Sequence, residues 1–188
     1  MDQHTPTREE ALLLLLEYNK DESHVKHGKA VEATMRQFAR KLGENEDKWG
    51  IIGLVHDLDW EMFPEIHCAK TREILTERGW PEDYIRAIMS HGWEMMTEVK
   101  PELPMEKVLY TIDELTGLVI STALVRPSRS LSDLTAKSVR KKWKEKSFAA
   151  GVNREVIEKG ASMLDMDLNE VITETIEGMK TVSAELGL

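Results

Sequence analysis

Apolar residues recur every three or four positions along most of the chain, the spacing that places them on one face of an α-helix. The clearest case sets Val31, Met35, Phe38 and Leu42 on one stripe, which ends at Gly43. No stretch alternates apolar and polar residues between hairpin-type turns, as paired strands would. The pattern therefore predicts an all-α protein. Helices are predicted within residues 5–20, 23–43, 46–58, 64–79, 81–92, 104–125, 134–151, 153–166 and 168–186.

Residues typical of helix ends support several of these boundaries. Thr7 followed by Glu10 is the sequence of a capping box, in which each residue satisfies a backbone N–H of the other. Pro64 and Pro81 are suited to helix starts, and Gly92 is suited to a helix end. No internal repeat and no long Gly, Ser or Pro linker interrupts the series. We therefore expect a single helical-bundle domain over residues 1–188.

Composition narrows the classes of function. Thirty-four acidic residues against 25 basic ones give a formal net charge of -9, which disfavours nucleic acid as a partner. The longest apolar run, at residues 11–16, is far shorter than the ~20 residues of a membrane span. The N-terminus lacks a basic segment followed by an apolar core, so no signal peptide is expected. A single cysteine, Cys68, suits a reducing compartment, and we expect a cytoplasmic protein.

Histidines and carboxylates recur on successive predicted helices. The six histidines are at positions 4, 24, 27, 56, 67 and 91. His4 is expected in a frayed tail, whereas the other five lie within predicted helices. Helix bundles build metal sites from such side chains when they project inward from facing helices. Each histidine alone is more often a hydrogen-bonded core residue, so only the joint pattern favours a metal.

The stretch "GLVHDLDW", residues 53–60, carries the strongest local signal. His56 and Asp57 interrupt an apolar run, and burying such groups costs free energy unless a partner compensates them. Asp113 stands similarly within a long apolar helix, where a nearby lysine or arginine could instead pair with it. Imidazole and carboxylate ligands suit Fe, Mn, Zn, Ni or Co, with Mg possible. One or two divalent ions are therefore expected.

These residues, in this order, resemble the HD-domain superfamily of metal-dependent phosphohydrolases, and especially its small bacterial putative hydrolases. The resemblance covers about residues 8–126, as a metal-binding helical core, and residues 127–188 are expected to be C-terminal helices covering it. It implies His27, or alternatively His24, as first ligand, the doublet His56-Asp57, and Asp113 as last ligand. Branches with two further histidines bind a second metal, which implies that His67 and His91 make the site binuclear.

The resemblance implies hydrolysis of a small phosphorylated metabolite or nucleotide, with a metal-activated water attacking phosphorus. Asp57 would be the catalytic residue, since it would bridge the ions and orient that water. A di-iron oxygenase that cleaves a C–C or C–P bond would use a similar ligand set. A non-enzymatic binding module on the same scaffold is a third hypothesis. The segment "HHExxDGxGYP" of cyclic-dinucleotide phosphodiesterases is absent, because Gly92, Trp93 and Glu94 follow His91.

Basic residues suggest a binding site for phosphate. Residues 137–146 contain six basic side chains and one acid, and we predict that Lys142 and Lys146 belong to a cationic flap over the metal. A solvated helix face is the alternative. Lys70 is a further candidate, although a surface pair with Glu73 would also explain it. Arg126 is another, although it stands about 20 Å along the helix from Asp113. The oligomeric state is left open.

One cysteine adjoins this constellation. Cys68 follows His67 directly, so its side chain is expected to point away from the metal and to pack as a small core residue.

Overall fold

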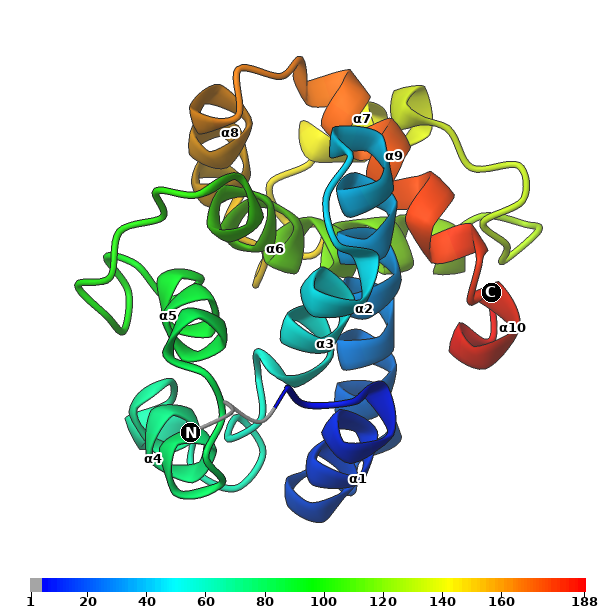
Figure 1. The fold of residues 1–188 in the computed structure, drawn as a ribbon. Coiled ribbons are helices and arrows are strands. Elements are labelled where there is room, and N and C mark those ends of the chain that lie inside the picture. The colour runs from blue at the N-terminus through cyan, green and yellow to red at the C-terminus, as the bar shows by residue number, and fades with distance from the viewer. Residues whose placement is uncertain (1–4) are drawn as a thin grey trace.

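A computed structural model describes residues 5–188 and shows a chain of helices joined by loops, of which those at 91–103, 125–135 and 144–153 are long (Figure 1). The helices are α1 (Arg8–Tyr18), α2 (Glu22–Leu42), α3 (Glu46–Val55), the 3₁₀ helix η1 (Pro64–Ile66), α4 (Ala69–Glu77), α5 (Glu82–Ser90), α6 (Pro104–Leu124), α7 (Ala136–Trp143), α8 (Arg154–Met163), α9 (Leu168–Lys180) and α10 (Ser183–Leu186). No strand occurs within these residues, so the all-α prediction is confirmed. His4 lies outside the described residues.

Local sequence explains where the helices begin and end. The predicted capping box is present at α1, where Thr7 accepts the backbone N–H of Glu10 and Glu10 accepts that of Thr7. Gly43 ends α2 with φ of 74°, a left-handed conformation that glycine adopts without steric cost. The side chains of Asn45 and Asn153 cap α3 and α8 in the same way as Thr7 caps α1.

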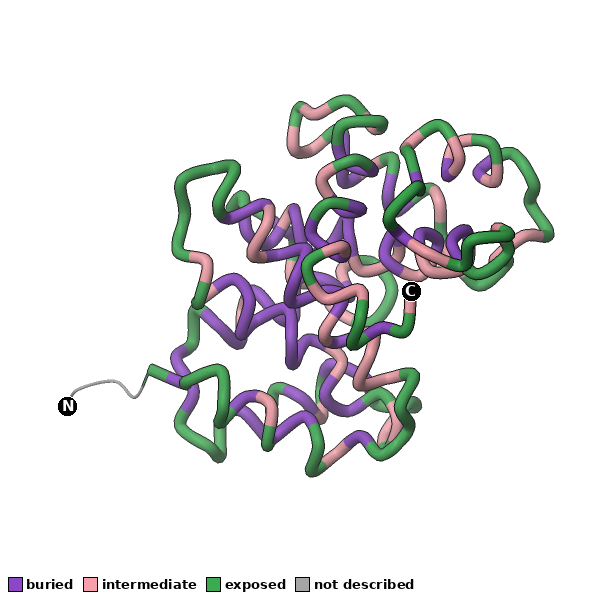
Figure 2. Tube along the Cα trace, turned by 90° about the vertical axis from the view of Figure 1, so that its right-hand side faces the viewer, coloured by how far each residue is buried: buried purple, intermediate pink, exposed green. Residues whose placement is uncertain are grey.

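The two longest helices, α2 and α6, pack against each other and form the centre of the protein. Their inward faces are apolar and fully covered, with Val31, Phe38, Leu109 and Ile112 all at 0% exposure. Figure 2 shows the same distribution, with buried residues in the interior and exposed residues along the outer loops. Among the described residues, no helix combines the length and apolarity that crossing a bilayer requires.

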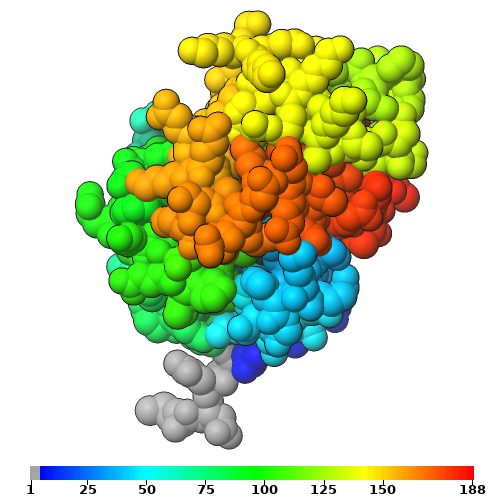
Figure 3. All heavy atoms as spheres, turned by 90° about the horizontal axis from the view of Figure 1, so that it is seen from above, coloured from blue at the N-terminus to red at the C-terminus, as the bar shows by residue number. Residues whose placement is uncertain are grey.

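The C-terminal helices pack onto this centre. Helix α8 lies on α6 and α9 lies on α2, and the segment from α7 to α10 occupies the upper half of the face in Figure 3. Glycines permit this close packing. A Cβ at Gly160 would lie 2.0 Å from Thr111 Oγ1, and one at Gly178 would lie 2.8 Å from the Cα of Thr34. The helices therefore approach to distances that only glycine allows.

Replacing Gly160 by valine should destabilise the fold. The added side chain would overlap Thr111, and overpacking of this kind costs ~1–3 kcal/mol. For a protein of this size that lowers the melting temperature by about 2–12 °C. Gly117→Ala is the matched control, since its Cβ would meet only Val152 Cγ2 at 3.7 Å and alanine favours helix. Thermal unfolding that is equal for both variants would contradict the packing argument.

Several predicted helix boundaries were wrong. The helix predicted over 46–58 ends at Val55, that over 134–151 ends at Trp143, and that over 168–186 divides into α9 and α10.

The start predicted at Pro64 was also wrong. Pro64 begins only the short η1, and α4 does not begin until Ala69. The chain turns at Cys68, whose φ is 67°, and this conformation cannot continue a helix. The Asp59 carboxylate then accepts the backbone N–H of Thr71 at 2.8 Å, which satisfies a free donor in the first turn of α4.

Candidate metal centre

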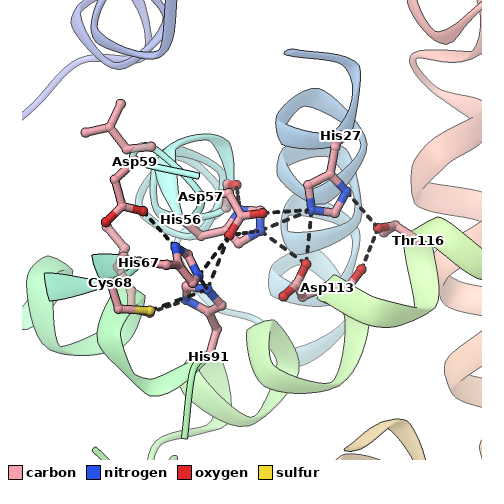
Figure 4. A network of polar contacts seen from close by, with 12 residues as sticks. His27, His56, Asp57, Asp59, His67, Cys68, His91, Asp113 and Thr116 are labelled. Carbon is pink, nitrogen blue, oxygen red and sulfur yellow. Dashed lines mark hydrogen bonds and ion pairs between the residues drawn. The ribbon is translucent and has the colours of Figure 1, made fainter. Parts of the chain in front are cut away.

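Four predicted residues from α2, the end of α3 and α6 converge at one point (Figure 4). His27 Nε2 lies 3.0 Å from Asp113 Oδ1 and 3.2 Å from His56 Nε2. His56 Nε2 lies 3.2 Å from the same oxygen, and Asp57 Oδ2 lies 3.6 Å from His27 Nε2. His24 takes no part, because its ring pairs with Glu61 at 3.2 Å.

A second group lies beside the first. His67 Nε2 and His91 Nε2 are 3.1 Å apart, and the His67 Nδ1 atom is held by Asp59 Oδ1 at 2.7 Å. Cys68 Sγ lies 3.9 Å from His91 Nε2 and is fully buried. The prediction that Cys68 points away was wrong, because the left-handed turn at this residue brings both adjacent side chains to the same side. The thiol is thus a third candidate ligand in this group.

His56 and His91 occupy equivalent positions at helix ends. Each directly follows the last residue of its helix as the C-cap, and each Nδ1 contacts the carbonyl oxygen three residues earlier: Gly53 at 2.8 Å and Ile88 at 2.5 Å. Carbonyls in the last turn of a helix lack the usual N–H donor four residues later, so each can accept the imidazole N–H, which fixes the ring; the Ile88 carbonyl also accepts the backbone N–H of His91 at 3.2 Å. The prediction that the histidines lie inside helices was wrong for these two, and also for His67, which lies in the loop before α4.

Asp57 stands between the two groups. Its Oδ1 lies 3.3 Å from His91 Nε2 and 3.5 Å from His67 Nε2, while its Oδ2 faces His27. One carboxylate therefore faces both groups, as a ligand that bridges two ions would, although its Oδ1 also lies 3.6 Å from His56 Nε2 in the first group. Figure 4 shows Asp57 at the middle of the network.

The donor set fits a bound cation. In His56, His67 and His91 the Nδ1–H is occupied by a carbonyl or carboxylate, so the neutral ring presents a lone pair at Nε2. Lone pairs that face each other at 3.1 Å repel unless a cation lies between them. Two imidazole nitrogens bound ~2.1 Å from one zinc-like ion lie about 3 to 3.4 Å apart, which matches the spacing here.

The electrostatics of the metal-free protein agree with this fit. Burial disfavours the charged form of His67, but the hydrogen bonds of its ring to Asp59 and Cys68 and the charge of Asp57 together outweigh burial and raise the pKa to about 9. Burial also opposes charge on His27, yet contact with Asp113 raises its pKa. For Asp113, burial is outweighed by the charges of His56 and His27, which hold its pKa well below the usual range. In the metal-free protein, protons on His27 and His67 thus compensate the negative charge of the carboxylates, as a bound cation would.

A family model for the HD domain matches residues 24–118. The chain belongs to the HD-domain family. The match spans every histidine and carboxylate of the two groups, which confirms the resemblance seen in the sequence. No curated protein and no solved structure matches the chain. The HD-domain match therefore supports the fold and the candidate metal site, but it does not identify a substrate.

Residues of both candidate ligand groups line a cavity of about 340 Å³. Its lining comprises His27, Asp57, Trp60, His67, His91, Gly92, Met95, Met96, Asp113, Glu114, Gly117, Gly151 and Val152. Sequence reasoning overlooked Trp60, Met95 and Met96 at the rim, and also Glu114, which accepts the Asn153 N–H at 3.0 Å. No lysine or arginine lines this cavity within residues 5–188.

The predicted phosphate-binding residues lie apart from that lining. Lys70 pairs with Glu73 at 2.6 Å, and Lys142 pairs with Glu145 at 2.8 Å. Arg126 lines a different cleft, and Lys146 is exposed. Their contact with a substrate stays a prediction, and the cavity itself offers no cationic side chain.

Replacing His91 by alanine should halve the metal content. If His67 and His91 hold a second ion, elemental analysis of protein purified without chelator should fall from about two transition-metal ions per chain to about one. His24→Ala is the control, because its ring faces Glu61 and its loss should leave the stoichiometry unchanged. An unchanged metal content in His91→Ala would show that His67 and His91 have a structural role and do not bind a second ion.

Proposed function

We infer that this HD-domain protein is a metal-dependent phosphohydrolase acting on a small phosphorylated metabolite or nucleotide. The observation that carries this inference is the position of Asp57. One carboxylate faces two groups of ligands at the floor of a cavity open to a small molecule. The HD-domain match and the His/Asp cluster support metal-dependent hydrolysis as the class of reaction.

Divalent ions held here would polarise a phosphoryl oxygen and lower the pKa of a water toward neutrality. His27, His56 and Asp113 would hold one ion, and His67 and His91 the other. Asp57, 26% exposed toward the cavity, is placed to accept a hydrogen bond from the attacking water and orient it. The contacts of Asp59, Gly53 and Ile88 keep the imidazoles aligned before substrate enters.

The cavity wall favours a substrate with one phosphate and an apolar or planar remainder. Trp60, Met95 and Met96 border the opening, and methionine packs adaptably against flat rings. Glu114 adds negative charge at the rim, and no lysine or arginine among residues 5–188 lines the cavity to neutralise further phosphates. The metal ions would therefore compensate the single phosphate while the wall contacts the rest.

A screen of phosphorylated metabolites tests this proposal. Protein supplied separately with Mn, Co, Ni, Zn, Fe or Mg is assayed for phosphate release. We expect turnover of monophosphates with a planar or apolar group to exceed that of sugar phosphates. Turnover should also exceed that of the corresponding di- and triphosphates. Failure to release phosphate from any compound, in protein shown to contain metal, would contradict hydrolysis.

A di-iron oxygenase is the second candidate, because the cluster joins four histidines and two aspartates. This chemistry requires iron and consumes oxygen. Iron-specific activity accompanied by oxygen uptake, without phosphate release, would favour it over hydrolysis.

A further inference from the structure

Many lysines and arginines of this protein have a carboxylate partner, but four basic residues on and just after α7 have none among residues 5–188. Arg36, Arg40, Lys41 and Lys48, for example, each pair with an acid within 3.2 Å. Within residues 5–188, no ion pair involves the basic residues Lys137, Arg140, Lys141 and Lys144. In a chain with nine excess negative charges, acids are abundant enough to pair them. Their concentration without acids therefore calls for another source of negative charge.

These cations surround a cleft of about 890 Å³ beside α7. It is lined by Arg126, Ala136, Lys137, Ser138, Arg140, Lys141, Lys144 and Asn169. Five of these residues are basic and none is acidic. The volume falls in the range of small-molecule sites, ~300–1,000 Å³. Arg126 is paired with Asp133, so four of the five positive charges have no ion pair among residues 5–188, and a concave surface of this kind suits a compact polyanion.

Two buried nitrogen atoms in the lining residues have no hydrogen-bond partner. Arg126 Nε is one, although the same guanidinium is fixed by Ser138 Oγ at 3.0 Å and by Asp133 Oδ2 at 2.6 Å. Arg140 Nη1 is the other, and its guanidinium lies over the ring of Trp143, 5.3 Å from the centroid. Buried donors are almost always satisfied, so these two N–H groups show that both guanidiniums are incompletely paired within the protein.

We propose that this cleft binds a small organic or inorganic polyphosphate at a site separate from the metal centre. The two cavities share no lining residue. Asp113 and Arg126 are thirteen residues apart on and just beyond α6, about 20 Å at the helical rise. Arginine donates in parallel to phosphate oxygens, and the three lysines add unpaired charge around them. A ligand with two or more phosphates matches these four cations better than a single phosphate does.

Titration calorimetry with inorganic tripolyphosphate tests the proposal. We expect one molecule to bind per chain, with affinity that falls as salt rises. Lys141→Ala/Lys144→Ala should weaken binding roughly tenfold or more, since charge-assisted contacts are lost. Lys20→Ala/Arg72→Ala is the control, because it removes the same charge from exposed residues outside the cleft and should change affinity by less than about twofold. All four side chains are exposed, so both variants should fold, as circular dichroism would verify.

Repeating the titration with Asp57→Ala separates this site from the metal centre. Binding that persists in Asp57→Ala supports the cleft, whether or not the protein proves to be a phosphohydrolase. Three results would overturn the proposal. The first is loss of tripolyphosphate binding in Asp57→Ala, and the second is no binding by the wild type. The third is equal weakening in Lys141→Ala/Lys144→Ala and in the control Lys20→Ala/Arg72→Ala. Tighter binding of a single-stranded oligonucleotide or of phosphatidylserine vesicles through Lys141 and Lys144 would also overturn it, since the cleft would then serve a macromolecule.

Discussion

Replacing Asp57 by asparagine should abolish catalysis while leaving the fold intact. Asparagine has nearly the same shape but no charge, so it cannot compensate two cations or accept hydrogen bonds as strongly. Metal ions stabilise charge in the transition state by several kcal/mol. Loss of ~4 kcal/mol corresponds to roughly a thousandfold in rate. We therefore expect phosphate release to fall about a thousandfold or more, together with a lower metal content.

Asp165→Asn is the matched control for this substitution. Asp165 is exposed, distant in sequence from the cluster, and has φ of 54°, a conformation that asparagine tolerates well. Its rate and metal content should equal those of the wild type. An Asp57→Asn enzyme with more than about a tenth of the wild-type rate at saturating metal would show that this carboxylate does not connect the two ligand groups.

The sequence predicted those parts of the site that depend on burial. His56, Asp57 and Asp113 interrupt apolar runs, and such runs are buried when they form the inward face of a helix. Polar groups there must converge on each other or on a cation, and all three do converge. The family match covers the same residues.

The parts that depend on loop conformation could not be predicted. Asp59 contacts both His67 and Thr71 because the loop after α3 returns beside α4, and spacing alone does not fix such a path. The orientation of Cys68 depends on one backbone angle. Glu114 follows Asp113 on α6, and neighbours on a helix point ~100° apart, so its position at the rim required the surrounding helices.

The location of the basic segment, residues 137–146, could not be predicted from the sequence either. Its charge is evident from the sequence, but its location depends on the turn between α6 and α7. Arg126 pairs with Asp133 at 2.6 Å, and this contact helps direct the chain into α7. The lysines then line their own cleft and not the metal cavity. No periodic pattern in the sequence predicts which of the two cavities the lysines line.

Removing metal with a chelator should destabilise the protein, and the loss should increase with pH. A metal at about a thousand times its dissociation constant stabilises the folded state by ~4 kcal/mol. For a chain of this length, that corresponds to a melting-temperature difference of about 8–16 °C between metal-bound and metal-free protein. The cluster lies where α2, α3, α5 and α6 meet, so its loss affects the centre of the fold.

The pH dependence follows from the imidazoles. The pKa of His67 rises from 6.5 to about 9 in the metal-free fold, so its proton stabilises that fold fully below about pH 6.5. This stabilisation is lost as pH rises through about 9, whereas metal binding gains because it requires the neutral ring. Asp57 and Asp113 have lowered pKa values and stay ionised throughout this range. Thermal unfolding at pH 6 and pH 8.5, with and without chelator, should therefore show a wider gap at pH 8.5. His24→Ala should keep that widening and His91→Ala should reduce it, and a gap equal at both pH values would contradict metal binding through these histidines.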